Sequence, residues 1–317
     1  MREAASSLAA LVPDHLNALR ARGYAATTVA ARRRHLKDFT TWLEDRGITR
    51  PGQVTLPVIE RYRLHLFERR KRDGAPLGWG SQAQQLLAVK GLFKWLTRAH
   101  HVATNPAAEL ELPRLPKRIP RTVLTAREAE LVLAQPDLDE PMGVRDRAIL
   151  ELLYSTGIRR AECSGLQLTD VDLARLVVLV REGKGGRDRY VPLGERAALW
   201  LDRYLRQVRP RYVTPPDEGW LFLTKRGRPL APKRLGSLVS AYVEGAGLGK
   251  QGSCHVFRHT MATLMLEGGA DVRHIQEILG HAELSTTALY THLSIGQLQA
   301  VHKRTHPARL IRKADGP

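Results

Sequence analysis

The feature that most constrains the fold is a basic, proline-rich stretch about one third of the way along the chain. Residues 112–121 read Leu-Pro-Arg-Leu-Pro-Lys-Arg-Ile-Pro-Arg and have no helical or strand periodicity. Three prolines so close together prevent a continuous helix and favour a semi-extended linker. We therefore predict one domain over residues 1–111, a linker over 112–121 and a second domain over 122–317. A chain of 317 residues can bury a core in each domain.

The first domain has the hydrophobic pattern of a small helical bundle. Apolar residues recur at helical spacing over 8–22, 28–47, 55–72 and 81–100. Short segments containing Gly, Pro or Asp separate these stretches. Four helices joined by short connections predict a bundle around a shared core.

The second domain is predicted to be mainly helical. Thr125 and Glu128 form the capping-box pattern of a helix start. Further helical patterns cover residues 145–155, 194–208 and 231–246. Strands are expected in only one place, between the helical patterns of residues 145–155 and 194–208.

That place is a predicted β-hairpin. Residues 176–180 are rich in β-branched side chains, and residues 189–192 form the return strand. The turn between them contains Gly183-Lys184-Gly185-Gly186, which places Lys184 near the tip. A phosphate-binding loop is the alternative interpretation, but the Lys-Ser/Thr pair of a P-loop does not follow these glycines.

Positive charge dominates the chain and is clustered. Lys and Arg number 50 against 32 Asp and Glu, a net charge of +18. Clusters occur at residues 32–34, 69–72 and 114–121. A basic composition can serve solubility alone, but clustering favours a polyanionic partner, above all nucleic acid.

The first domain and the linker hold the candidate DNA contacts. Arginine and lysine neutralise phosphates, and glutamine can pair with adenine in the major groove. For any single glutamine, an ordinary solvated helix face is the alternative. The predicted DNA-binding residues are Arg32, Arg33, Arg34, Gln84, Gln85, Lys90, Lys94, Arg114, Lys117 and Arg118.

The sequence predicts a cytoplasmic setting. Cys163 and Cys254 are the two cysteines and lie far apart, which argues against a disulfide framework. Pro13-Asp14-His15 interrupts the mildly apolar start before a signal-peptide core forms. No apolar run approaches the length of a membrane-spanning helix, so no membrane partner is expected.

Residues 255–292 concentrate basic side chains and one phenol, Tyr290, on segments that otherwise have the pattern of short helices. His255 and Arg258 are three residues apart and would share a helix face. Zinc binding by His255 and His259 is an alternative. However, Val256 stands where a HExxH motif has glutamate, and no third ligand is evident. The pattern favours a phosphate site without metal.

Five stretches of the second domain resemble the catalytic domain of the tyrosine recombinases, nearest to the Xer branch. Together, in the order in which that family has them, they are far more specific than any one alone. The first domain resembles the family's core-binding (SAM-like) domain in size and charge. The five stretches are Arg145-Asp146-Arg147-Ala148 leading into residues 156–162, Gly183-Lys184-Gly185-Gly186, residues 255–259, Leu279-Gly280-His281 and residues 286–292.

The resemblance implies a fold and a set of phosphate ligands. The fold would be mainly α with a small antiparallel β-sheet in the catalytic domain, and the two domains would form a C-shaped clamp on DNA. Arg159 and Arg258 would bind the phosphate, because a guanidinium stays charged and presents a fork of donors. His281 would hydrogen-bond the phosphate, and Glu162 would brace an arginine.

The resemblance also implies how the strand is cut. Tyr290 would be the nucleophile and form an O-(3′-phospho-DNA)-tyrosine intermediate, which keeps the bond energy for rejoining. His255 would act as general acid or base. Lys184 would protonate the leaving 5′ oxygen. The chemistry needs no cofactor and no catalytic metal.

The resemblance therefore implies a site-specific DNA recombinase for integration, excision or dimer resolution. It would act on double-stranded DNA at a specific target as a homo- or hetero-tetramer, with or without a paralogous recombinase or accessory protein. Residues 296–305 are predicted to be a helix that docks on a neighbouring subunit or, alternatively, packs on its own domain.

Two other functions share parts of this pattern. A catalytically silent DNA-binding protein would not need all six active-site residue types together. A type IB topoisomerase shares the chemistry, but the helical first domain and the Xer-like carboxyl terminus favour recombination. A metal-dependent nuclease would need clustered carboxylates, whereas those of residues 267–283 are scattered.

Overall fold

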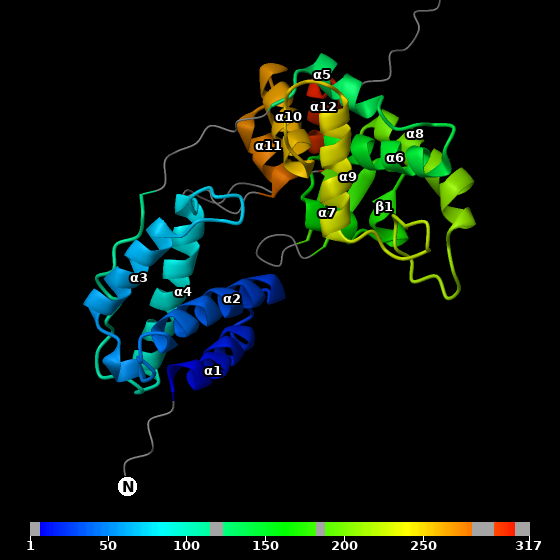
Figure 1. Ribbon diagram of the computed structural model, residues 1–317. Coiled ribbons are helices and arrows are strands. Elements are labelled where there is room, and N and C mark those ends of the chain that lie inside the picture. The colour runs from blue at the N-terminus through cyan, green and yellow to red at the C-terminus, as the bar shows by residue number, and fades with distance from the viewer. Residues whose placement is uncertain (1–6, 115–122, 182–187, 281–294, 308–317) are drawn as a thin grey trace, which may run out of the picture. The chain divides into compact units, whose positions relative to one another are not determined.

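The computed structural model describes residues 7–114, 123–181, 188–280 and 295–307, with side chains of the last range from Gln299 onward. The chain divides into two compact units, residues 1–118 and 119–317, and this division falls within residues 112–121. Figure 1 labels the α-helices of each unit.

Unit 1 is a bundle of four helices around one core. The second and fourth helices pack on each other, and the first packs on both. The core contains aromatic rings in edge-to-face contact, with 4.8 Å between the centroids of Phe39 and Tyr62. The helices are α1 (Leu8–Ala21), α2 (Ala26–Glu44), α3 (Leu56–Glu68) and α4 (Trp79–Arg98), with a 3₁₀ turn, η1 (Pro51–Gln53), before α3.

The third helix is shorter than predicted. It ends at Glu68 rather than Arg72, because the chain reverses direction just after it. The Lys71 amide donates to the Ala75 carbonyl (2.8 Å), and Gly74 takes a positive φ of 77° within this turn. The turn places the cationic residues 69–72 on a loop beside the start of α4 instead of on a helix.

Unit 2 surrounds one almost wholly buried helix, α6 (Pro141–Thr156). Helices α5, α8 and α10 and the strand β3 pack against it. A Thr125–Glu128 capping box starts α5, as predicted. The other helical elements are α5 (Ala126–Leu133), α7 (Arg160–Ser164), η2 (Leu168–Asp170), α8 (Glu195–Arg203), η3 (Tyr204–Val208), η4 (Arg209–Arg211), α9 (Pro232–Gly245), α10 (Cys254–Glu267), α11 (Val272–Leu279) and α12 (Ile295–Thr305).

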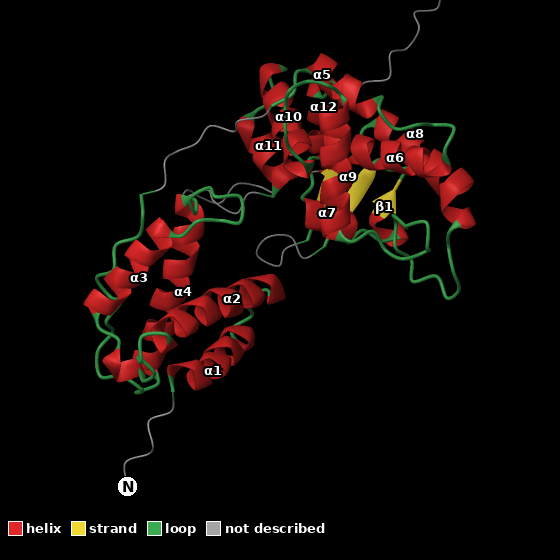
Figure 2. Ribbon diagram, in the orientation of Figure 1, coloured by secondary structure: helices red, strands yellow, loops and turns green. Residues whose placement is uncertain are grey.

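Unit 2 also contains a small antiparallel sheet in the order β1-β2-β3, drawn in yellow among the red helices in Figure 2. Strands β2 (Val177–Val180) and β3 (Arg189–Pro192) pair with Val178 opposite Val191, as the predicted hairpin requires. The hairpin tip, including Lys184, lies outside the described residues. Strand β1 (Val171–Asp172) adds an edge that the sequence did not reveal.

Helix α12 packs on its own unit, against β3, α10 and α11. Two buried histidines fix it to the end of α6. His302 Nε2 donates to the Ser155 carbonyl (2.6 Å), and His306 Nε2 donates to the Tyr154 carbonyl (2.7 Å). Within one chain the helix therefore packs on its own domain, and its docking on a neighbouring subunit stays a prediction. None of the helices in the described ranges has the length and apolar character needed to cross a bilayer.

Candidate active site and nucleic-acid interface

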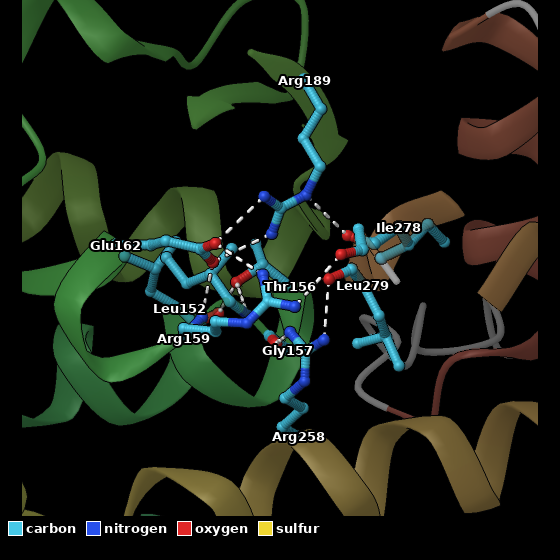
Figure 3. Close-up of polar contacts among 11 residues, drawn as sticks. Leu152, Thr156, Gly157, Arg159, Glu162, Arg189, Arg258, Ile278 and Leu279 are labelled. Atoms are coloured by element: carbon cyan, nitrogen blue, oxygen red, sulfur yellow. Dashed lines mark hydrogen bonds and ion pairs between the residues drawn. The ribbon is translucent and has the colours of Figure 1, made fainter. Parts of the chain in front are cut away.

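Three arginines from three different elements converge on the carboxyl end of α11 (Figure 3). Each donates to one of three successive main-chain carbonyls. Carbonyls at a helix end lack intrahelical partners and carry partial negative charge, so guanidinium groups suit them. The three bonds are Arg189 Nε to the Ile278 oxygen (3.2 Å), Arg258 Nη2 to the Leu279 oxygen (2.7 Å) and Arg159 Nη2 to the Gly280 oxygen (3.1 Å).

Glu162, on α7, binds two of these arginines at once. Arg159 donates to it through Nη1 (2.8 Å) and through its main-chain amide (2.7 Å). Arg189 donates through Nη1 (3.1 Å) and Nη2 (2.9 Å), one to each carboxylate oxygen. Burial raises the pKa of Glu162, but the hydrogen bonds from Arg189 and from the Arg159 amide outweigh burial and hold the pKa at about 2. The predicted bracing of an arginine by Glu162 is the contact observed.

Arg258 is buried on α10 and binds the end of α6. Its Nη1 donates to the Gly157 carbonyl (2.7 Å). Gly157 ends α6 with a φ of +58°, and a Cβ there would lie 2.3 Å from the Met261 Cε. Burial and then the charge of Arg159 lower the pKa of Arg258 to about 10, which leaves the group charged at neutral pH.

His255 lies one helical turn before Arg258 on α10, as predicted. Burial, followed by the charges of His259 and Arg258, lowers its pKa. The imidazole is therefore neutral near pH 7 and can accept a proton. The rings of His255 and His259 lie 6.4 Å apart, and among the described residues no three His, Cys, Asp or Glu side chains gather as metal ligands would.

The predictions for Lys184, His281 and Tyr290 fall outside the described residues. The structure thus brings together Arg159, Arg258, Glu162 and His255 out of the predicted active-site set.

Arg189 is a member of this cluster that sequence reasoning missed. The sequence pattern assigns residues 189–192 only to the return strand of the hairpin. The available signal was an arginine at the first position of a strand directly after the glycine-rich turn.

In unit 1, cationic side chains line a cavity of about 930 Å³ between α2, the loop after α3 and the start of α4. Arg34, Gln84 and Gln85 of the predicted DNA-binding set lie here. The loop adds four cations that were not predicted as contacts, residues 69–72, of which Arg69 pairs with Asp38 (3.2 Å). The signal that could have found them was the charge cluster itself.

Two of the predicted DNA contacts form hydrogen bonds within unit 1. Gln85 is buried, and its Oε1 accepts a hydrogen bond from the Tyr62 hydroxyl (3.3 Å). The Lys90 ammonium donates to the carbonyls of Ala108 (3.1 Å) and Leu110 (2.8 Å). Both side chains thus bind partners within the bundle, and Gln85 also lines the cationic cavity, so their contacts with DNA stay predictions.

The other predicted contacts differ in exposure. Arg32 is half-buried and donates to the Gln84 carbonyl (3.2 Å), whereas Arg33, Lys94 and Arg114 are exposed. Lys117 and Arg118 lie outside the described residues.

Comparisons with known proteins show the family of the chain. Residues 122–296 match the phage integrase family. Tyrosine recombinase XerC 2 of Ralstonia nicotianae is 53% identical over 299 residues, which cover 94% of this chain and 86% of that protein. Tyrosine recombinase XerD of Pseudomonas aeruginosa is 36% identical over 286 residues, which cover 90% and 93%.

Two solved structures show the same fold. The XerH site-specific recombinase bound to difH substrate has a TM-score of 0.67 at 20% identity, covering 87% of this chain and 79% of that chain. The Tn1549 transposon integrase in complex with circular intermediate DNA has a TM-score of 0.66 at 21% identity, covering 93% and 98%.

A mainly helical fold with a small antiparallel sheet is thus the fold that this chain shares with a site-specific recombinase and a transposon integrase solved on DNA. The chain belongs to the phage integrase family and is a tyrosine-type site-specific recombinase of Xer-like sequence. The fold class and the reaction class predicted from the sequence are confirmed, and the silent-binder and topoisomerase alternatives are not favoured.

Proposed function

We propose that Arg159 and Arg258 hold the scissile phosphate of a specific duplex DNA site and that Tyr290 attacks it. The phenol oxygen bonds to phosphorus while the bond from phosphorus to the 5′ oxygen breaks, which leaves a 3′-phosphotyrosine and a free 5′ hydroxyl. A second 5′ hydroxyl then attacks the phosphotyrosine, which forms a new phosphodiester bond and releases the Tyr290 phenol. The observation that carries this proposal is the convergence of Arg159 and Arg258 beside Gly280, which directly precedes His281.

Both arginines keep donors for a ligand. A guanidinium has about five N–H groups. The bonds of Arg159 use one hydrogen on Nη1 and one on Nη2, to Glu162 and Gly280. Arg258 likewise uses one on each, to Gly157 and Leu279. The remaining N–H groups can bind non-bridging phosphate oxygens, where charge develops in the transition state.

The proton transfers are assigned to two further residues. Neutral His255 accepts the phenol proton, directly or through water, which matches its lowered pKa. Lys184 protonates the departing 5′ oxygen, and His281 adds a hydrogen bond to the phosphate. These assignments for Lys184 and His281 rest on their motifs, Gly183-Lys184-Gly185-Gly186 and Leu279-Gly280-His281.

Unit 1 is proposed to be the core-binding domain, and unit 2 the catalytic domain. The cationic cavity of unit 1 fits the phosphate backbone of DNA, because Arg34 and residues 69–72 line it. Gln84, on the same cavity, can reach a base edge. Arg33, Lys94 and Arg114 remain proposed contacts on exposed positions.

The assembly is proposed to be a homo- or hetero-tetramer on DNA in the cytoplasm. It would integrate, excise or resolve DNA elements, with or without a paralogous recombinase or accessory protein. Relatives named as XerC and XerD recombinases support a Xer-type task.

A cleavage assay tests the proposal. Protein–DNA adducts captured under denaturing conditions from cells that express the chain would supply the target sequence, and a duplex of that sequence nicked near the cut would trap the intermediate. We expect covalent complex with wild type and with Tyr190→Phe, a control tyrosine that is 55% exposed on β3. Tyr290→Phe should give none, and Arg159→Ala should cleave about 100- to 1000-fold more slowly. Normal cleavage by either variant would contradict the proposal.

A further inference from the structure

Arg189 holds two parts of unit 2 together at the arginine cluster. It is the first residue of β3, and its side chain is only 13% exposed. Its Nη1 and Nη2 bind Glu162 of α7, and its Nε binds the Ile278 carbonyl of α11. One planar group thus connects the element that carries Arg159 to the helix that ends just before His281.

The carboxylate of Glu162 is shared evenly between the two arginines. Its Oε1 accepts from Nη1 of both, and its Oε2 accepts from the Arg159 amide and from Arg189 Nη2. With Arg189 present, neither oxygen of Glu162 is available to Arg159 alone. Without it, the carboxylate could turn to bind the Arg159 fork with both oxygens, which would draw that guanidinium away from the Gly280 carbonyl.

Gly280 shows how closely Arg189 fits the end of α11. A Cβ on Gly280 would lie 2.9 Å from both Cζ and Nε of Arg189, so the guanidinium lies directly against this glycine. Gly280 also has a φ of +62°, which favours glycine. The close approach of Arg189 to Gly280 therefore depends both on the backbone conformation of Gly280 and on the pairing of Arg189 with Glu162.

We propose that Arg189 is a positioning residue for strand cleavage: it fixes the Glu162 carboxylate so that Arg159 presents its free donors to the phosphate. The inference rests on the proposed role of Arg159 at the scissile phosphate. Arg189 itself does not need to touch DNA, because all three of its bonding nitrogens face the protein.

The geometry of the fork, and not charge alone, is what this role requires. Lysine would keep the positive charge but cannot bind both carboxylate oxygens and the Ile278 carbonyl in one plane. We therefore expect Arg189→Lys to slow single-turnover cleavage of the nicked duplex about 10- to 100-fold, a loss typical of a misplaced catalytic group. The Kd for the same DNA should change less than about threefold, since surface phosphate contacts dominate binding.

A matched control separates positioning from plain structural support. Arg209 binds Asp217 with both Nη atoms (2.8 and 2.7 Å) and the Trp220 carbonyl with Nε (3.0 Å), the same pattern as Arg189 outside the cluster. Arg209→Lys should lower thermal stability but leave the cleavage rate of the folded protein within about twofold, because it supports no phosphate ligand.

A double-mutant cycle tests whether Arg189 affects cleavage by holding Glu162. If Arg189 acts by fixing this carboxylate, adding Arg189→Lys to Glu162→Gln should slow cleavage no further than the slower single variant. Effects that multiply, or a rate for Arg189→Lys within twofold of wild type, would overturn the inference. If Arg189→Lys does not fold, Arg189→Gln provides the same comparison, since its amide cannot form the fork either.

Arg159→Ala is assayed in the same experiment. It distinguishes failure of the proposed phosphate site from failure of the positioning role of Arg189. Normal cleavage by Arg159→Ala would refute the proposed phosphate site. Impaired cleavage by Arg159→Ala together with normal cleavage by Arg189→Lys would refute only the positioning role.

Discussion

Replacing Glu162 with glutamine should destabilise unit 2 by about 3 kcal/mol at neutral pH. The pKa of Glu162 is about 2 against an ordinary 4.5, a difference of 2.5, and each pH unit corresponds to about 1.36 kcal/mol. The side chain is only 8% exposed, so solvent screening reduces this figure little. Glutamine keeps the shape but leaves the guanidinium groups of Arg159 and Arg189 without their shared counter-charge.

The sign of the pH dependence is specific. A depressed carboxyl pKa contributes stability that is complete above pH 4.5 and is lost as pH falls toward 2. The difference between wild type and Glu162→Gln should therefore shrink by about 1 kcal/mol between pH 7 and pH 4.

Urea unfolding followed by circular dichroism at the two pH values measures this difference. Glu195→Gln is the control, because its ion pair with Lys303 is exposed and should contribute less than about 1 kcal/mol. A Glu162→Gln protein as stable as wild type at pH 7, or a difference that grows toward pH 4, would refute the electrostatic reasoning.

Three further predictions concern other parts of the chain. Gly157→Ala should lower stability by about 1–3 kcal/mol in a thermal melt, because its Cβ would be placed at a positive φ and into a packed core. Burial lowers the pKa of His302 and of His306. At His306 the charges of His302 and Arg196 lower the pKa further, and the hydrogen bond to the Tyr154 carbonyl partly offsets this. The unfolded chain therefore takes up protons first, and the unfolding free energy should fall by up to about 1.4 kcal/mol per histidine from above pH 7.5 to pH 5.5. Arg70→Ala should reduce the slope of log affinity for DNA against log salt by about 0.9.

Each of these has a control that should behave differently. Gly91→Ala, within α4 and with open space around the added Cβ, should be neutral or stabilising. Replacing His306 with glutamine should remove its share of the pH dependence, and stability equal at pH 7.5 and pH 5.5 in wild type would contradict that prediction. Arg206→Ala changes an exposed arginine paired with Asp202 on unit 2, and an equal loss of salt dependence there would contradict a specific role for Arg70.

Local patterns were predictable from the sequence because they depend on near neighbours. The Thr125–Glu128 capping box and the pairing of 176–180 with 189–192 are of this kind, and both are observed. The end of the third helix was not predicted, because a compact turn over residues 69–77 overrides the helical pattern.

Long-range packing explains the other differences. The partners of Arg189 lie 27 and 89 residues away, so nothing beside it in the sequence identifies its role. The internal hydrogen bonds of Gln85 and Lys90 were not predicted, because periodicity does not show which polar side chains turn inward, here to Tyr62 and to the carbonyls of residues 108 and 110. The cluster residues Arg159, Glu162, His255 and Arg258 were found because each sits in a motif of specific composition.

The most direct test of the mechanism is to identify the residue that carries the DNA. Wild-type protein trapped on its nicked target would be digested with nuclease and protease, and the peptide that retains a nucleotide would be sequenced by mass spectrometry. We predict the adduct on Tyr290. An adduct on any other residue, such as Tyr190, or cleavage without any covalent adduct, would contradict the tyrosine mechanism assigned to this position.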